Sequence, residues 1–143
     1  MQIALVGSVL GRLLMLFSVT MLTPLPVDLY YGDGAWPVFT LSFAAALTAG
    51  FLIWLPARRA RGELKLRDGF LIVASFWLVL GSSGALPLLF TQVPELSFTD
   101  AMFEAISGLT TTGATVLTGL DEAPKAILYY RQQLQWLGGL GIV

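Results

Sequence analysis

The chain has 143 residues, of which 56% are hydrophobic and 12% are charged, and its mean hydropathy is +0.78. Soluble domains carry about twice that charged share, and a fold this small could not cover its surface with so few charges, whereas lipid requires no polar coat. The net charge of -1 offers no field that would attract nucleic acid. With neither Cys nor His, the chain lacks the commonest metal ligands and general base, which disfavours most enzymes.

The first apolar run covers residues 1–22, and we expect a membrane helix that ends before Pro24 and Pro26. A cleaved signal peptide is the alternative. It fails because no Lys or Arg precedes the run, Arg12 interrupts it, and no small-x-small cleavage site precedes Pro24. We expect the Arg12 side chain to snorkel toward the inner face.

The second span is predicted at residues 36–55, which are 20 residues without a charge, and Pro56 ends it. The following residues 56–68 are basic, whereas residues 23–35 contain no Lys or Arg; the bases of the loop are Arg58, Arg59, Arg61, Lys65 and Arg67. The positive-inside rule therefore places Met1 and residues 56–68 in the cytoplasm.

A third span is predicted from Gly69 to about Phe90, running outward. A fourth apolar stretch, residues 126–143, contains Arg131 and has no polar stop or cap. We therefore expect the chain to be an N-terminal fragment of a longer protein, in which the fourth span runs inward.

Between these spans, residues 97–109 predict a short amphipathic helix that Ser97 or Thr99 caps. About 11 residues reach roughly 16 Å, which is half of a bilayer core. The helix can therefore enter the membrane but cannot cross it. Its predicted apolar face is Phe98, Ala101, Met102, Ala105, Ile106 and Leu109, and its predicted polar face is Asp100, Glu104, Ser107 and Thr111.

Residues 110–115 follow as a run of small residues whose chemistry is limited to carbonyls and hydroxyls. Non-helical backbone at membrane depth must be buried in protein or face water, so a dipping loop of this kind predicts a pore. The C-terminal end of an entering half-helix also favours a cation. The chain would return through residues 117–123, where Asp121 or Glu122 caps a helix that begins at Pro124. The alternative is an amphipathic helix and turn lying in the interface.

Residues 106–116, ISGLTTTGATV, resemble the first pore loop of the TrkH-type bacterial potassium transporters. Residues 124–128, PKAIL, and 131–142, RQQLQWLGGLGI, are similar to the loop and second pore helix of that family. The resemblance implies membership of the Trk, Ktr and HKT superfamily, which is built from four helix, pore-loop, helix repeats around one axis. It covers essentially the whole chain.

The resemblance implies an all-α integral membrane fold with a re-entrant pore helix and filter loop. Residues 1–68 would be two leading helices with a basic cytoplasmic loop, and residues 69–143 would be the first pore repeat. The family's filter glycine maps onto Gly113, and the K+ ligands would be the carbonyls of Thr111, Thr112 and Gly113. The implied location is the bacterial inner membrane, with lipid around the chain.

The resemblance also implies two protein partners: a second copy of the full-length subunit, forming a homodimer, and a cytoplasmic nucleotide-binding regulatory subunit, TrkA. No cofactor is expected, and the transported ion is K+. A non-conducting membrane scaffold or assembly subunit remains the alternative function. A membrane enzyme is disfavoured, because no His, Cys or convergent carboxylate pair is present.

Several other residues have two interpretations each. Arg131 lies about two turns below Pro124, where an ion pair with Glu104 that braces the pore helix competes with a role in conduction. Acidic Asp100 and Glu104 either concentrate cations at an outer mouth or stabilise the helix start. The small residues Gly7 and Gly11 allow dimerisation or packing within the chain.

Overall fold

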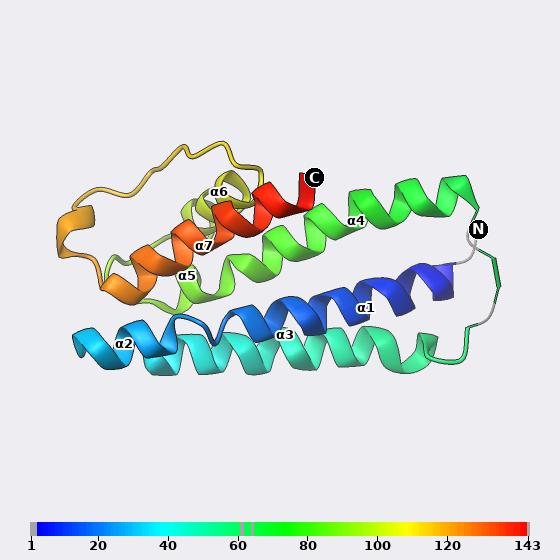
Figure 1. Cartoon of the computed structure of the whole chain (residues 1–143), viewed down its shortest axis with the longest axis horizontal. Helices are drawn as coiled ribbons and strands as arrows, with labels where there is room; N and C mark the ends of the chain where they lie inside the picture. The colour runs from blue at the N-terminus through cyan, green and yellow to red at the C-terminus, as the bar shows by residue number, and fades with distance from the viewer. Residues whose placement is uncertain (1–2, 61, 64, 143) are drawn as a thin grey trace.

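The computed structural model describes residues 3–60, 62, 63 and 65–142, and the described part is helical apart from its connections (Figure 1). Met1, Arg61 and Val143, which enter the predictions above, lie outside the described residues. In chain order the elements are α1 (Ile3–Thr20), α2 (Leu25–Tyr31), α3 (Trp36–Ala57), α4 (Leu66–Gly84), α5 (Leu86–Phe90), α6 (Phe98–Leu109), the short 3-10 helix η1 (Leu120–Glu122) and α7 (Lys125–Ile142).

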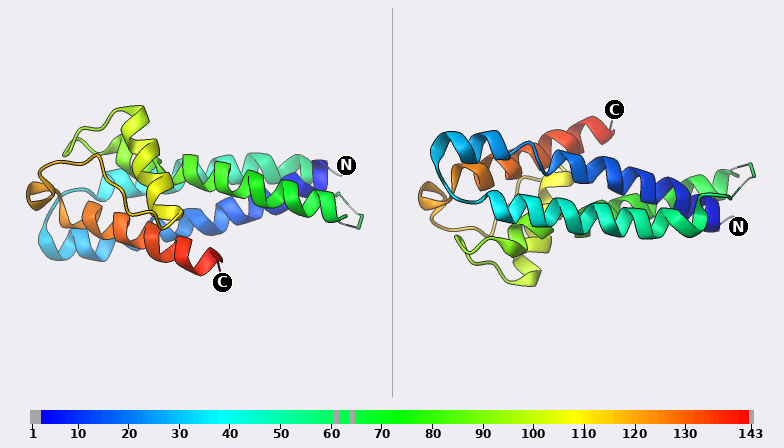
Figure 2. Two further views of the ribbon diagram at one scale, coloured as in Figure 1. Left: turned by 90° about the horizontal axis from the view of Figure 1, so that it is seen from above. Right: turned by 90° about the horizontal axis from the view of Figure 1, so that it is seen from below.

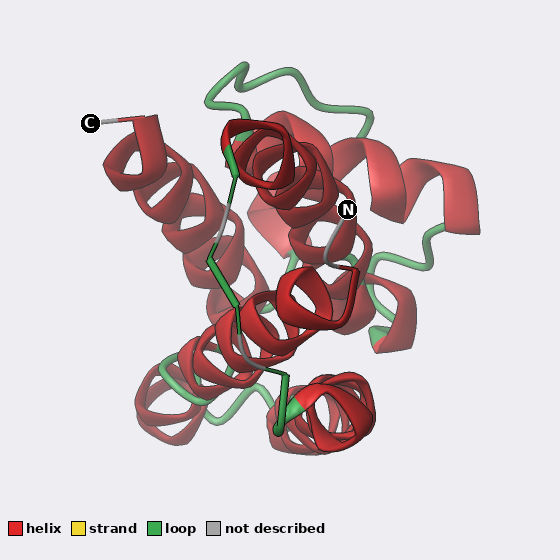
Figure 3. Ribbon diagram, turned by 90° about the vertical axis from the view of Figure 1, so that its right-hand side faces the viewer, coloured by secondary structure: helices red, strands yellow, loops and turns green. Residues whose placement is uncertain are grey.

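Three helical segments of the described chain are long and apolar enough to cross a membrane: Ile3–Tyr31, Trp36–Ala57 and Leu66–Phe90. Each corresponds to one of the first three predicted spans. α7 is not among them, because an arginine and three glutamines at residues 131–133 and 135 lower its apolar character. Viewed along the long axis, the helices form a bundle with no sheet among the residues drawn (Figure 3).

The first span differs from its prediction, because it does not end near residue 22 but extends to Tyr31. A turn at residues 21–24 interrupts it, and α2 then continues the span to Tyr31. The predicted effect of the prolines was therefore only half right. Pro24 and Pro26 lie at the start of α2, where a missing N–H leaves no helical hydrogen bond unmade, so they end one helix and begin the next.

The third span is also interrupted, which the sequence did not predict. α4 ends at Gly84, and α5 begins two residues later with Pro87 in its first turn. The hydroxyl of Tyr130 on α7 donates a hydrogen bond to the Gly84 carbonyl at 2.9 Å, and both residues are buried. A side chain of the neighbouring helix thus provides a hydrogen bond to the backbone carbonyl at the break, as backbone embedded in lipid requires.

The contact between α1 and α3 depends on two glycines. A Cβ atom at Gly11 would lie 2.7 Å from the Gly50 carbonyl oxygen, and one at Gly50 would lie 2.9 Å from the Gly11 carbonyl oxygen. Gly7 belongs to the same contact, since a Cβ there would lie 3.8 Å from the Cβ of Ala57. The small-residue face therefore packs within the chain, as the intramolecular interpretation predicted.

The two ends of the bundle differ in chemistry. The start of α1 and the connection from α3 to α4 lie at one end, and α2 and η1 lie at the other (Figures 1 and 2). This is the arrangement required if Ile3 and the basic loop share one side of the membrane. At the opposite end, the buried carboxylate of Asp28 accepts hydrogen bonds from the backbone N–H groups of Ala35 (2.6 Å) and Trp36 (3.1 Å), which open α3.

Candidate pore loop

The helix α6 lies obliquely to the long axis, in the half of the bundle that carries η1, ends about halfway along the bundle, and is followed by a segment that returns to the η1 end (Figure 2). Its 12 residues correspond to about 18 Å, too short to cross a bilayer core. Ser97 caps it, as predicted, by accepting a hydrogen bond from the Asp100 N–H at 3.2 Å. The predicted half-helix therefore forms with its predicted start.

The C-terminal end of α6 is closed by a tight series of backbone hydrogen bonds. The Thr111 N–H donates to the Gly108 carbonyl at 2.9 Å, and the N–H groups of Thr112 and Gly113 both donate to the Ser107 carbonyl, at 2.9 and 3.3 Å. Two residues adopt left-handed backbone angles, Thr111 with φ of 57° and Gly113 with φ of 74°. A β-branched residue there is strained, whereas glycine is not.

The three residues predicted as K+ ligands occupy this turn and are exposed in the chain. Within the described chain, the carbonyl oxygens of Thr111, Thr112 and Gly113 accept no hydrogen bond. The carbonyl of the next residue, Ala114, does accept one, from the Ser107 hydroxyl at 2.7 Å. These three carbonyls, like that of Thr110 before them, are free within the described chain, and they lie at the C-terminal end of a helix, where the dipole is negative.

Glu104 holds the returning segment against α6. One of its carboxylate oxygens, Oε1, accepts hydrogen bonds from the Thr115 hydroxyl (2.5 Å) and from the N–H groups of Val116 (2.7 Å) and Leu117 (3.3 Å). The other oxygen, Oε2, lies 2.9 Å from an Arg131 guanidinium nitrogen. The Glu104 side chain is only 1% exposed, so it is fully enclosed by these partners.

This arrangement overturns one prediction and supports another. Glu104 and Ser107 were expected on the polar face, and Glu104 was considered as an acid that concentrates cations at an outer mouth; both residues are buried, while Phe98 and Ile106 of the predicted apolar face are exposed. The physical reason is that the returning segment offers unpaired N–H groups that an apolar face could not satisfy. The Glu104–Arg131 ion pair was the favoured structural interpretation of Arg131, and it is present.

The start of α7 is capped by a residue that the sequence did not indicate. The carboxylate of Asp33, in the connection between α2 and α3, accepts a hydrogen bond from the Ala126 N–H at 3.0 Å. The expected caps, Asp121 and Glu122, are instead exposed and belong to η1. The start of α7 is therefore capped by an acid 93 residues away in the sequence and not by the adjacent acids.

α7 crosses the end of α6 at a glycine. A Cβ at Gly138 would lie 1.9 Å from the Leu109 carbonyl oxygen, and one at Gly108 would lie 3.0 Å from the Leu134 Cβ. The neighbouring Gly139 has more space, since its nearest contact would be the Thr111 Cγ2 at 3.9 Å. The glycines of α7 thus bring its backbone directly against the turn that carries the free carbonyls.

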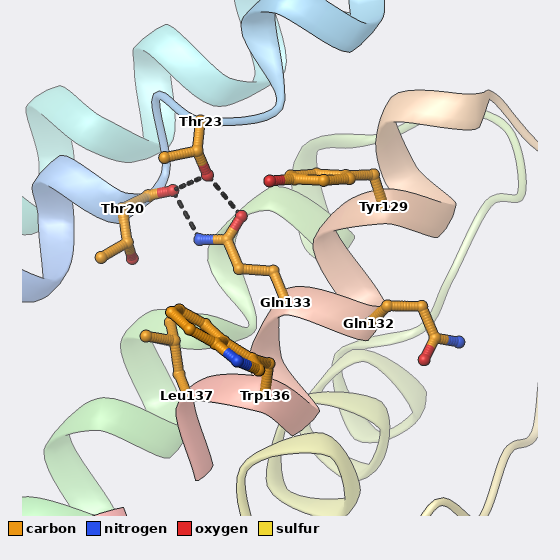
Figure 4. Close-up of a pocket in the computed structure, with 7 residues that line it drawn as sticks. All are labelled: Thr20, Thr23, Tyr129, Gln132, Gln133, Trp136 and Leu137. Carbon is orange, nitrogen blue, oxygen red and sulfur yellow. Dashed lines mark hydrogen bonds between the residues drawn. The ribbon is translucent and has the colours of Figure 1, made fainter. Parts of the chain in front are cut away.

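The break between α1 and α2 is joined to α7 through Gln133 (Figure 4). Its amide nitrogen donates to the Thr20 carbonyl at 2.7 Å, and its amide oxygen accepts from the Thr23 hydroxyl. The adjoining cavity of about 300 Å3 is lined by Thr20, Thr23, Tyr129, Gln132, Gln133, Trp136 and Leu137. The side chain of Gln133 is therefore a structural link from the first span to the pore-loop region.

The sequence did not indicate the roles of four residues that position the loop region: Ser107, Thr115, Asp33 and Gln133. Three of them bond to segments whose position depends on the tertiary fold, and no local pattern marks such pairs. The fourth, Thr115, is exposed, and its bond to Glu104 likewise depends on how the returning segment packs against α6.

The fold and loop together define a multi-span helical membrane protein with a re-entrant half-helix and an extended return. A family model described as "TrkH: Cation transport protein" matches residues 35–143. The chain belongs to this cation transport protein family. This match and the structure together confirm the resemblance to the TrkH-type family and the predicted all-α membrane fold with a pore helix.

Individual relatives agree. The chain is 56% identical over all its 143 residues to the "Trk system potassium uptake protein TrkH" of Halomonas elongata, and 58% identical over 135 residues to the protein of that name from Escherichia coli K12; it spans 30% and 28% of their lengths. The crystal structure of the potassium transporter TrkH from Vibrio parahaemolyticus matches with a TM-score of 0.94 and 58% identity, over 99% of this chain and 30% of that one.

Proposed function

We propose that this chain contributes one pore loop to a potassium uptake pathway, with the carbonyl oxygens of Thr111, Thr112 and Gly113 as ligands of dehydrated K+. The observation that carries the proposal is the set of three successive carbonyls that accept no hydrogen bond within the described chain. Carbonyl oxygens replace the hydration shell of K+ in selectivity filters. The names of the relatives, which are potassium uptake proteins, point to the same ion.

Transport itself belongs to a longer protein, called here the parent protein, since the chain spans about 30% of the length of its relatives. In this proposal residues 69–143 form one repeat around the pore, and residues 1–68 form a leading pair of helices. The parent protein lies in the bacterial inner membrane with the N-terminus in the cytoplasm, forms a homodimer, and binds the regulatory subunit TrkA.

A cysteine-protection experiment tests whether the turn lines the ion path. Thr112→Cys in the parent protein should react with a small charged thiol reagent added from outside, and K+ should slow that reaction more than Na+ does. Thr99→Cys, exposed at the start of α6, serves as the control that reacts without protection by K+.

Two results would count against the proposal. If Thr112→Cys reacts at the same rate with and without K+, the turn does not hold the ion, and a non-conducting scaffold becomes the better interpretation. If K+ slows both cysteines equally, the effect is not specific to the turn.

A further inference from the structure

Ser107, on the buried face of α6, bonds three successive residues of the turn. Its carbonyl accepts the N–H groups of Thr112 and Gly113, and its hydroxyl donates to the Ala114 carbonyl at 2.7 Å. Ser107 is only 6% exposed, so its hydroxyl makes this bond from a buried side chain. A single serine therefore bonds three successive residues of the turn: Thr112, Gly113 and Ala114.

The Ala114 carbonyl marks a change along the chain. The three carbonyls before it are free within the described chain, whereas this one is bonded to the helix. From Thr115 onward the segment is held by Glu104, three residues before Ser107 and so on the same face of α6. Ser107 thus lies at the boundary between the carbonyls that accept no hydrogen bond within the described chain and the segment that Glu104 holds against α6.

We infer that Ser107 is a specificity-determining positioning residue, whose hydroxyl turns the Ala114 carbonyl away from the ion path and ends the run of ligand carbonyls at Gly113. The inference rests on the proposed function. Without the hydroxyl, the Ala114 carbonyl is a buried acceptor with no donor, and an unpaired polar group is driven to find another partner. Rotation toward the path changes the number and spacing of oxygens, on which discrimination between K+ and Na+ depends.

No neighbouring hydroxyl replaces Ser107. Thr110 lies one turn further along, but its hydroxyl is 2.8 Å from the Ile106 carbonyl and 2.8 Å from the Thr112 hydroxyl. Thr115 donates to Glu104. The loss of the Ser107 hydroxyl is therefore not compensated by the hydroxyl side chains around it.

The test is Ser107→Ala in the parent protein, in cells that lack other potassium uptake systems. Rubidium and sodium fluxes are measured and normalised to the protein in the membrane. We expect the rubidium-to-sodium ratio to fall about three- to tenfold, the size expected from one net hydrogen bond. Ser107→Thr, which keeps the hydroxyl, should restore the ratio, and a residue with only a structural role would not show this selectivity pattern.

The control is Ser42→Ala. Ser42 is also buried, and its hydroxyl donates to the Val38 carbonyl at 2.7 Å within α3, away from the turn. Its ratio should equal that of the unmodified protein. If Ser107→Ala does not accumulate in the membrane, Ser107→Cys, of similar size but a weak donor, tests the same prediction.

An unchanged ratio in Ser107→Ala or, failing that, Ser107→Cys, with protein present, overturns the inference. Gly113→Ser is measured in parallel to separate this failure from that of the proposed function. If Gly113→Ser alters flux or selectivity while the Ser107 variant does not, only the role of Ser107 is refuted. If neither variant alters them, the turn is not a filter.

Discussion

The guanidinium of Arg131 lies 2.9 Å from a carboxylate oxygen of Glu104, and this ion pair joins the half-helix α6 to α7. The remaining carboxylate oxygen holds the segment that returns from the turn. The pair therefore connects both helices of the loop region to the loop itself. Its side chains are 10% and 1% exposed, so both charged groups are largely shielded from water.

Breaking this pair should destabilise the chain strongly. Arg131→Met and Glu104→Gln each leave a buried group without its partner, which we expect to lower stability by about 3–5 kcal/mol. The double variant should lose less than the sum of the single losses, with a coupling above about 1 kcal/mol. Thermal unfolding of the purified variants in detergent measures this, and strictly additive losses would show that the two residues do not interact.

Two adjacent glycines on α7 provide a matched pair of substitutions. Gly138→Ala places a Cβ 1.9 Å from the Leu109 carbonyl oxygen, and Gly139→Ala places one 3.9 Å from its nearest neighbour. Since overpacking costs roughly 1–3 kcal/mol, and more against backbone, we expect Gly138→Ala to reduce the folded protein in the membrane severely. Gly139→Ala should accumulate normally. Equal accumulation of both would contradict the close crossing of α6 and α7.

Gln132 and Gln133 provide a second matched pair. Gln133→Leu removes the partner of the Thr20 carbonyl and of the Thr23 hydroxyl at the break between α1 and α2. We expect a loss of about 1–3 kcal/mol in stability, the usual result of leaving a buried polar group without its partner. Gln132→Leu should have little effect, because that side chain is exposed and makes no hydrogen bond within the described chain. Equal melting temperatures for the two variants would refute the link.

The orientation is tested by alkaline phosphatase fusions. A fusion after Glu63, in the basic connection, should be inactive because the enzyme remains in the cytoplasm, and a fusion after Glu95 should be active in the periplasm. The start of α1 lies at the same end of the bundle as the basic connection, which fits this orientation. If the Glu63 fusion is active, the membrane orientation of the chain is the opposite of the one predicted, and α6 enters from the cytoplasmic side.

The half-helix was predictable because its signals are local. Ser97, Asp100 and the periodic apolar residues that follow lie within one short segment, and that segment alone fixes the start, type and length of α6. The turn after α6 was also expected from a local run of small residues, and Gly113 within it adopts a left-handed backbone that disfavours other residues. The Glu104–Arg131 pair followed from the rise per residue of two helices.

The contacts that position the loop were not predictable in the same way. Periodicity assigned Glu104 and Ser107 correctly to one face of α6, but it could not show that the returning segment covers that face. The Asp33 cap of α7 depends on where the first three spans place the connection after α2. The break at residues 21–24 was misread because a proline pattern does not distinguish the end of a span from a restart, and the break at Ala85 was not predicted.

Gly113→Ser in the parent protein tests the proposed filter most directly. Gly113 has φ of 74°, which costs a residue with a Cβ about 1–2 kcal/mol, although nothing in the chain lies within 4 Å of that Cβ. The matched control is Gly7→Ser, in the α1–α3 contact, where a Cβ meets Ala57 at an ordinary 3.8 Å.

The measurement is rubidium and sodium flux in cells without other uptake systems, normalised to protein in the membrane. Gly113→Ser should reduce rubidium flux, or its ratio to sodium flux, about tenfold at a nearly unchanged protein level, since about 1.4 kcal/mol corresponds to a factor of ten. Gly7→Ser should match the unmodified protein. Unchanged flux and ratio in Gly113→Ser, with normal protein level, would show that the turn at residues 111–113 does not line the ion path.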